Sequence, residues 1–427
     1  MDTTVLLFAI TALLVVLFIL GVPIFVGLAV WCILISQVVN LSLANIGIAL
    51  YEGLNFFGLL AMPLFILTGD LINVSGIAVK LTRFAHSCFC WIRGGQAIAA
   101  LGACGIFAAI SGSNAATTAT IGTIMYPEMV KDGYDRKFAA ATIAAGGTVG
   151  IIIPPSILFI TYGFLVNIPA SDLFIGGIFP GILMVLVMQL VCFIFASKNR
   201  WGSLAPFNGK GAGKAAREAY LGFAAIFVIM FGIYTGAFSP TESAAMCVAF
   251  CLGAGIFITK EISLKTIPSV FFSSGKLVGT LAPLVAISSA VQQCISAMGV
   301  DIWLQENFLQ MGYTGVLTVS MVIIFVSGMF LESVPIITIL APILAPIAHA
   351  AGIHPVHFAV IVLVGTTIGF ITPPFGLNIF VACSVTDLPF RQVIRYLWPY
   401  VIGLSAVWIL CAIFPIISTA LVSSTMY

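Results

Sequence analysis

The strongest constraint on this chain is a series of apolar segments, each long enough to cross a lipid bilayer, that recur along its whole length. Because backbone N–H and C=O groups find no water in the bilayer core, such segments fold as helices. Only 7% of the residues are charged and 61% are hydrophobic, against roughly 25% charged residues in soluble domains. The sequence therefore predicts an all-α integral membrane protein, with spans near 4–20, 22–37, 56–79, 138–166, 171–197, 219–237, 240–259, 276–298, 356–386 and 393–420.

The charged residues and cysteines argue against several other classes of protein. The 16 Lys and Arg residues are spread over 427 positions with a net charge of +2, so no basic face for nucleic acid is expected. The ten cysteines form no CxxC motif and no Cys/His cluster, which favours buried packing residues over disulfides or metal ligands. The first apolar run lacks a basic flank and an A-x-A site, so we interpret it as a retained helix and not a signal peptide.

Two further apolar regions, 94–128 and 313–349, are interrupted by small or polar residues. Each is predicted to form two short helices around a tip, as a re-entrant hairpin that enters and leaves the membrane on one side. With both chain termini placed in the periplasm, every Lys and Arg falls on the cytoplasmic side or at a cytoplasmic helix end. This arrangement satisfies the positive-inside rule.

A repeated motif divides the chain into two halves. The stretches "GGTVGIIIPPS" and "GTTIGFITPPF" share the pattern G-x-T-x-G-x-x-x-P-P, and their first residues, Gly146 and Gly365, lie 219 residues apart. The same offset aligns the two hairpin tips, which enter from opposite sides of the membrane. We therefore predict an inverted-topology repeat, with a first half at 1–197, a cytoplasmic linker at 198–218 and a second half at 219–427.

The motif predicts a site because it breaks a helix at bilayer depth. Paired Gly/Pro-broken segments in corresponding halves are typical of the binding site of secondary transporters. Breaking the helix at G-x-T-x-G frees backbone carbonyls that can replace the hydration shell of Na⁺, and the Thr hydroxyls add further oxygens. Beyond the Pro-Pro pair the helix begins again, and its N-terminal amides suit a carboxylate.

The two hairpin tips are expected to complete this site. Ser113 and Asn114 resemble the N-cap of the returning helix, and we favour a ligand role for the Ser-Gly-Ser-Asn tip. For Thr120 and Thr123 on the same helix, hydrogen bonds to nearby carbonyls and close packing are the better interpretation. The second tip carries Glu332, Ser333 and Pro335, so the halves differ chemically.

Acidic residues within apolar segments indicate a function or a structural partner, because an ionised acid at the bilayer centre costs roughly 2.5–3.5 kcal/mol. For Glu332, a functional role is the better interpretation, since it lies beside the second predicted ion site. Glu242 follows Ser239-Pro240-Thr241, and a helix cap and a functional role are equally compatible with it. For Asp70, a structural hydrogen bond or a contact with another subunit is the better interpretation. The HPVH stretch at 354–357 is interpreted as solvated.

These motifs together resemble the large membrane subunit of tripartite ATP-independent periplasmic (TRAP) transporters over nearly the whole chain. The resemblance rests on "SGSNAATTATIG", "GGTVGIIIPPS", "GAFSPTESAA", "GTTIGFITPPFGLN" and the "PLFILTGDL" run at 63–71. It implies a sodium-coupled elevator importer of the bacterial inner membrane, in which a transport domain moves across a scaffold domain. It also implies two partners: a small membrane subunit, expected to be a separate chain, and a periplasmic binding protein that delivers a carboxylate substrate.

The resemblance also implies where ions and substrate bind. The first sodium site falls on Ser111, Ser113, Asn114, Gly146, Val149 and Pro154, and the second on Gly328, Glu332, Gly365, Thr366, Thr367 and Gly369. Many of these residues would act through backbone carbonyls. Substrate contacts are assigned to Ser156, Asn378, Thr148 and Ser333. No organic cofactor is expected.

The overall similarity favours the sialic-acid branch of the family, although no single motif selects the acid. Two Na⁺ carried with one monocarboxylate would move a net charge of +1 inward. Alternatives are a sodium/proton antiporter, for which Glu332 is the candidate acid, and a Na⁺/dicarboxylate symporter of a related elevator fold. An enzyme is not expected, because the chain contains no P-loop, HExxH or GxSxG-like motif.

Overall fold

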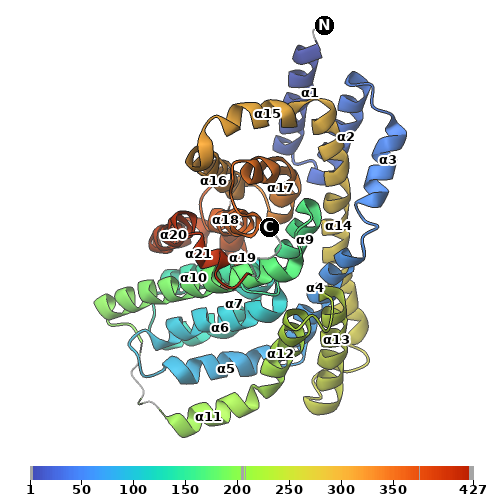
Figure 1. Ribbon diagram of the computed structural model, residues 1–427. Coiled ribbons are helices and arrows are strands. Elements are labelled where there is room, and N and C mark those ends of the chain that lie inside the picture. The colour runs from blue at the N-terminus through green and yellow to red at the C-terminus, as the bar shows by residue number, and fades with distance from the viewer. Residues whose placement is uncertain (1–2, 203–205, 207, 375, 423–427) are drawn as a thin grey trace.

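Helices make up the regular secondary structure of the described residues, which in this computed structural model are 3–202, 206, 208–374 and 376–422 (Figure 1). Seven helices in this part of the chain are long and apolar enough to cross a membrane, or eight if the bent pair α11–α12 is one span. The prediction of an all-α, multi-pass membrane protein is therefore confirmed.

The first half contains ten α-helices joined mostly by short glycine or proline turns. Glycines with left-handed backbone angles precede α5 and α6 and separate α6 from α7, namely Gly76, Gly94 and Gly112. The helices are α1 (Thr3–Ile19), α2 (Ile24–Val38), α3 (Leu43–Glu52), α4 (Ala61–Val74), α5 (Ile77–Phe89), α6 (Gly95–Ser111), α7 (Asn114–Lys131), α8 (Arg136–Gly146), α9 (Ile157–Val166) and α10 (Ala170–Asn199).

The second half has the same order of long helices, hairpin and broken helix. Its helices are α11 (Gly209–Glu218), α12 (Tyr220–Tyr234), α13 (Pro240–Gly253), α14 (Ile267–Ala297), α15 (Val300–Leu309), α16 (Gly312–Phe330), α17 (Ser333–Ala350), α18 (Pro355–Gly369), α19 (Leu377–Thr386), α20 (Phe390–Ile413) and α21 (Ile416–Thr419). Both ends of α17 lie 219 residues beyond those of α7, which is the offset of the sequence motif.

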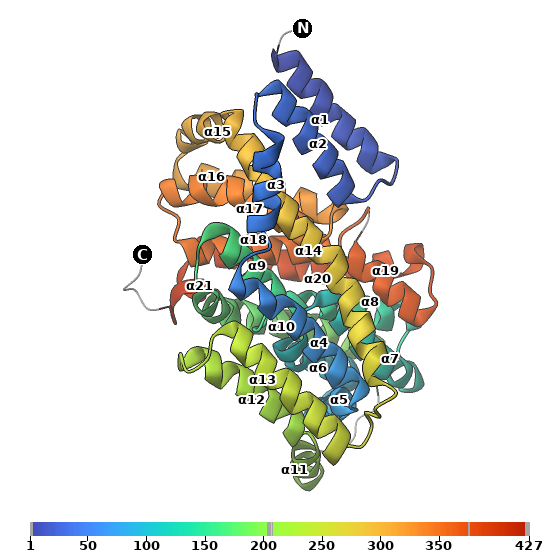
Figure 2. The same ribbon diagram turned by 90° about the vertical axis from the view of Figure 1, so that its right-hand side faces the viewer.

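Two groups of helices lie against each other. Helices α1–α4 and α12–α14 form one side of the molecule, and the hairpins with α8–α10 and α18–α20 form the other (Figure 1). Helix α14 runs along the first group from α2 and α3 at one end to α4 at the other (Figure 2). We call these groups the frame and the hairpin body. The amphipathic helices α5 and α11 pack together at one end.

Several boundaries differ from the predicted ones. The span at 56–79 ends at Val74, because Ser75-Gly76 turns the chain into the separate helix α5. Helix α14 begins at Ile267, not near 276, so Lys276 lies inside the helix, where its Nζ atom sits 4.6 Å from the centroid of the Phe272 ring. The hairpin helices are 17–19 residues long and are therefore not short.

The connection between the halves is partly helical. Helix α11 occupies the second part of the linker predicted at 198–218 and begins with Asn208 as its N-cap, whose side chain accepts a hydrogen bond from Gly211 N. Residues 203–205 and 207 of that linker lie outside the described residues, as does Phe375. The two chain ends, which were predicted to lie in the periplasm, are also outside them.

Candidate functional site

The first hairpin tip lies directly on the first helix break. A methyl group on Gly150 would lie 2.5 Å from the Ser113 carbonyl oxygen and 2.8 Å from Asn114 Cα, so only glycine permits this approach. Gly112, between the hairpin helices, has φ +57°, and a methyl group there would lie 2.9 Å from the Pro155 carbonyl oxygen. The structure therefore brings together three features that the sequence indicated: the first hairpin tip, the first G-x-T-x-G stretch and the first Pro-Pro pair.

Ser111, Ser113 and Asn114 are held by hydrogen bonds within the tip. Ser113 caps α7 by accepting a bond from Ala116 N, as predicted. The Thr117 hydroxyl donates to Ser113 O at 2.7 Å and lies 3.0 Å from Ser111 Oγ. Hydrogen bonds within the first hairpin thus fix the hydroxyl groups of Ser111, Ser113 and Thr117 relative to one another.

Side chains take up two of the carbonyls freed where α8 ends at Gly146. Asn378 Nδ2, from the start of α19 in the other half, donates to Ala144 O at 3.3 Å. The Thr148 hydroxyl donates to Ala145 O at 2.6 Å and approaches Met188 Sδ of α10 at 4.0 Å. Thr148 therefore stabilises the end of α8, and Asn378 joins the two broken helices.

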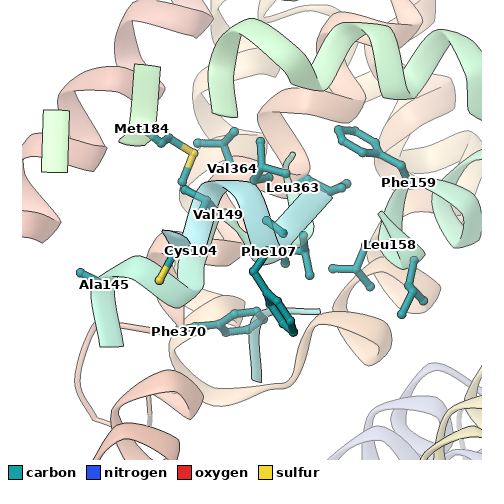
Figure 3. Packing of buried hydrophobic residues seen from close by; sticks show 14 of the residues in the cluster. Cys104, Phe107, Ala145, Val149, Leu158, Phe159, Met184, Leu363, Val364 and Phe370 are labelled. Atoms are coloured by element: carbon teal, nitrogen blue, oxygen red, sulfur yellow. The ribbon is translucent and has the colours of Figure 1, made fainter. Parts of the chain in front are cut away.

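The Val149 carbonyl and the Ser156 side chain both form hydrogen bonds within the first break. Val149 O accepts bonds from Ile152 N and Ile153 N, both at 3.1 Å, and its side chain points into an apolar cluster with Cys104 and Val364 (Figure 3). Ser156 caps α9 through Phe159 N and donates to Ile151 O at 2.6 Å. Gly146 packs against Cys104 of α6. Both Pro154–Pro155 and Pro373–Pro374 are cis peptide bonds.

The second break starts later than predicted. Helix α18 continues through Gly369, so the G-x-T-x-G stretch at 365–369 is still helical. Phe370 N donates to Thr367 O, although a continued α-helix would use Thr366 O. Thr366 O lies beside the second hairpin, 3.0 Å from where a methyl group on Gly328 would be.

Gly328 and Gly369 form the closest approach at the second break, because a side chain on Gly369 would overlap the Gly328 backbone. Gly365 instead packs against the Trp408 ring of α20. The Thr366 and Thr367 hydroxyls donate to Val362 O and Val364 O at 2.8 Å. Of the predicted second-site residues, Gly328, Thr366 and Gly369 are thus brought together through their backbones.

The remaining second-tip residues lie at the start of α17. Glu332 is its N-cap residue, without a side-chain cap bond, and its side chain is exposed. Ser333 is buried in the first turn. The second helix of each hairpin packs against a helix of the other half of the chain: α7 packs against α19, and α17 packs against α9. Each half of the chain therefore contributes to the surroundings of both breaks.

Two buried polar atoms near the first break have no hydrogen-bond partner, namely Asn114 Nδ2 and Asn378 Oδ1. Asn114 is 5% exposed and Asn378 is fully buried, and Gly147 lies between Thr118 and the Asn378 amide. Buried polar groups are rarely left unpaired in native proteins. Asn114 on α7 thus has an unused donor and Asn378 on α19 an unused acceptor, and these two helices pack against each other.

The other acids of the apolar segments have structural roles. Asp70 Oδ2 accepts a 2.6 Å bond from Ser274 of α14, in agreement with a structural hydrogen bond. Glu242 forms a capping box with Ser239, whose N–H and hydroxyl both donate to Glu242 Oε2 at 2.8 Å. The cap explanation for Glu242 is therefore the one that the geometry favours.

The prediction that the HPVH stretch is solvated is wrong for His357, whereas His354 and Pro355 are half-buried. His357 is fully buried and its Nδ1 lies 2.8 Å from Ser418 Oγ of α21, while His354 Nδ1 accepts a bond from Val356 N. The unbroken run of apolar and small residues that follows His357 in α18, a helix buried on every face, was the signal that would have placed His357 inside. Thr123 donates to Ala119 O at 2.8 Å, as expected, but Thr120 Oγ1 accepts a 2.7 Å bond from Asn73 Nδ2, a contact between the frame and the first hairpin that was not predicted.

Comparison with known proteins assigns the chain to a family. The family model described as "Tripartite ATP-independent periplasmic transporter, DctM component" matches residues 11–417. The chain belongs to this family. The C4-dicarboxylate TRAP transporter large permease of Pseudomonas aeruginosa is 35% identical over 89% of this chain and 90% of its own length.

Two Vibrio cholerae relatives extend this result. A C4-dicarboxylate TRAP large permease is 35% identical, covering 90% of both chains, and a sialic acid TRAP large permease is 29% identical, covering 92% of this chain and 91% of its own. The solved YdaH transporter of Alcanivorax borkumensis shares the fold, with a TM-score of 0.64 at 14% identity over 87% of this chain and 88% of that one. The chain is thus a TRAP large permease, a transporter component and not an enzyme.

Proposed function

We propose that this TRAP permease imports an organic acid across the bacterial inner membrane, driven by Na⁺, through an elevator movement of the hairpin body along the frame. The observation that supports this most is the meeting of each glycine-lined helix break with a hairpin, Gly150 with Ser113 and Gly369 with Gly328. Closely approaching backbones present hard carbonyl oxygens, which are the ligands that Na⁺ uses in broken-helix transporters.

For the substrate we propose a C4-dicarboxylate before a sialic acid. The two dicarboxylate permeases are each 35% identical to this chain, whereas the sialic acid permease is 29% identical. The N-terminal amides of α9 and α19 begin beside the breaks and suit carboxylates. Asn114 Nδ2, a buried donor without a partner, is a further candidate contact for a carboxylate oxygen.

The proposed mechanism assigns one Na⁺ to each break. At the first, the donors are oxygens of Ser111, Ser113, Asn114, Gly146, Val149 and Pro154; at the second, those of Gly328, Glu332, Gly365, Thr366, Thr367 and Gly369. Thr148, Ser156, Asn378 and Ser333 border the substrate. Because Na⁺ attracts a hairpin tip to each break, ion binding would close the site and permit movement only when it is loaded. A tenfold Na⁺ gradient supplies about 1.4 kcal/mol per ion.

The proposed partners are a small membrane subunit against the frame and a periplasmic binding protein that supplies the acid from outside. With both chain termini in the periplasm, the first hairpin opens to the cytoplasm and the second to the periplasm. This orientation makes the two halves an inverted repeat, in which alternating access follows from movement of one body against the other.

The decisive experiment compares thermal unfolding of the purified permease and its small subunit in sodium, potassium and choline chloride. A ligand at 100 times its Kd stabilises by about 2.7 kcal/mol, so sodium alone is expected to raise the midpoint. Gly150→Ala and Gly369→Ala should blunt this rise, because the added methyl group separates tip from break. Gly275→Ala is the matched control, since nothing lies within 4 Å of the added methyl group.

Uptake of labelled succinate into proteoliposomes containing the permease, its small subunit and the binding protein completes the test. Sodium-dependent uptake that both glycine substitutions reduce is the expected result. Uptake that proceeds equally well in potassium would contradict sodium coupling. Sodium-driven proton flux without any organic acid would instead favour the antiporter.

A further inference from the structure

The contact between Asn73 and Thr120 is a polar contact that joins the frame to the hairpin body. Asn73 Nδ2, near the end of α4, donates to Thr120 Oγ1 of α7 at 2.7 Å. One turn earlier, Gly69 faces the first tip, where a methyl group would lie 3.4 Å from Ser111 Cα, an ordinary contact distance. Any sliding of the hairpin body along α4 must break this bond.

The other half of the chain has a different arrangement at the equivalent place. The 219-residue offset that relates α7 to α17 takes Thr120 to Ile339 on α17 and Asn73 to Gln292 on α14, whereas Pro63 and Pro283 align at an offset of 220, which takes Asn73 to Gln293. Of these two glutamines, Gln292 is the one that lines a cavity against the hairpin. Gln292 and Ile339 both line a cavity of about 120 Å³ between these two helices. One carboxamide is therefore bonded to its hairpin, and the other faces its hairpin across a cavity.

The cavity wall offers acceptors to Gln292. Pro342 and Pro346 line it and carry no N–H, so Thr338 O and Pro342 O lack the helical donor that residues four positions later normally supply. Thr338 also lines the cavity. A shift of α17 along α14 could therefore bring a carbonyl without its α-helical partner to the Gln292 amide, which is a good donor.

We propose that Asn73 and Gln292 are positioning residues that hold the hairpin body in alternate states of transport. In an inverted repeat the two halves exchange conformations when access alternates. The state seen here closes the Asn73–Thr120 bond and leaves Gln292 unengaged; the opposite state breaks the first bond and joins Gln292 to the turn around Thr338. The inference rests on the proposed elevator movement.

The test measures the distance between the two bodies directly. Spin labels are attached through a keto amino acid at Met246 on α13 and Val322 on α16, both exposed and on opposite bodies, so that the ten native cysteines do not interfere. Distance distributions are recorded for the permease with its small subunit in nanodiscs. Two populations are expected, and their ratio reports which state is favoured.

Asn73→Leu should lower the population of the state seen here relative to the other by about twofold to tenfold, the effect of one hydrogen bond. Thr120→Val should do the same, whereas Thr120→Ser, which keeps the hydroxyl, should not. Gln292→Met should shift the ratio the opposite way by a similar factor. The double variant Asn73→Leu/Gln292→Met should return close to the original ratio.

Gln293→Met is the matched control, because Gln293 is the next residue along and does not line the cavity. If two populations are seen but their ratio is unchanged by Asn73→Leu and Gln292→Met, or changes in the same direction in both, the proposed roles of Asn73 and Gln292 are wrong. The proposed elevator movement would still stand. A single population in every variant, with and without sodium and succinate, would overturn both.

Discussion

At the scale of single residues, Asn378 has two roles in one side chain. Its Nδ2 atom closes the end of α8 by donating to Ala144 O, and its Oδ1 atom is buried without a partner. Losing the amide leaves the Ala144 carbonyl unpaired, which costs about 1–3 kcal/mol. It also removes the acceptor offered to a ligand beside Gly147 and Thr118. Within the part of the chain that the structure describes, no other side chain of the second half bonds to a carbonyl of this first break.

Asn378→Ala is therefore expected to raise the KM for substrate by roughly tenfold, the effect of one hydrogen bond of about 1.4 kcal/mol. Sodium should still raise the unfolding midpoint of this variant, because the sodium ligands are on other residues. Uptake kinetics and thermal unfolding together provide the measurement. Asn199→Ala, at an exposed asparagine, is the control, and unchanged uptake kinetics in Asn378→Ala would contradict a substrate role.

Ser239 supports a residue-scale prediction that concerns stability alone. Its hydroxyl accepts the Glu242 N–H in the capping box at the start of α13. Ser239→Ala should lower the free energy of unfolding by about 1 kcal/mol, with sodium-dependent uptake unchanged. Thermal unfolding measures the first and transport assays the second. A large loss of transport at normal stability would revive the functional interpretation of this "SPTE" stretch.

At the scale of elements, the two broken helices share one sequence motif and differ in where they break. Local sequence predicted a break at G-x-T-x-G in both, because glycine and Pro-Pro disrupt helices wherever they occur. In the first, Asn378 takes the Ala144 carbonyl and α8 ends at Gly146. In the second, Trp408 donates to Ile361 O at 2.8 Å and packs on Gly365, and α18 continues to Gly369. Asn378 and Trp408 are distant in sequence from the helices that they contact, so the motif alone could not predict these contacts.

The same contact yields a prediction about helix packing. A methyl group on Gly365 would overlap the Trp408 ring, so Gly365→Ala should destabilise the protein by about 1–3 kcal/mol through overpacking of α18 against α20. Trp408→Phe, which shortens the ring, should recover part of this loss in the double variant. Thermal unfolding of the two single variants and the double variant measures the coupling. Strictly additive losses would show that the two residues do not interact.

Elements that the sequence did not predict are short or amphipathic. Helices α3, α5, α11 and α15 have 10–13 residues, and α5 and α11 carry charged residues on one face. These helices are too short or too polar to be recognised as apolar segments of spanning length. The hairpins and breaks were predictable because glycine, proline and capping serines act locally, as Ser113 at the start of α7 shows. His357 was misjudged because its partner, Ser418, is 61 residues away.

At the scale of the whole molecule, the proposed assignment of one Na⁺ to each helix break fixes the charge that moves with each substrate. Two Na⁺ with a sialic acid carry a net charge of +1, whereas two Na⁺ with a C4-dicarboxylate carry none. A membrane potential acts only on net charge, with about 2.3 kcal/mol per elementary charge per 100 mV. The electrical response of transport therefore distinguishes the two substrate classes.

For the proposed dicarboxylate, we expect steady-state accumulation of succinate in proteoliposomes to change less than twofold when a potential of about 100 mV, negative inside, is imposed at a constant Na⁺ gradient. A monocarboxylate carried with two Na⁺ would instead accumulate about fiftyfold more, since 2.3 kcal/mol corresponds to a factor of about 50. Potassium gradients with valinomycin set the potential, and vesicles lacking the permease provide the control. A fiftyfold response with succinate would mean that a third ion moves, and the one-ion-per-break assignment would be incomplete.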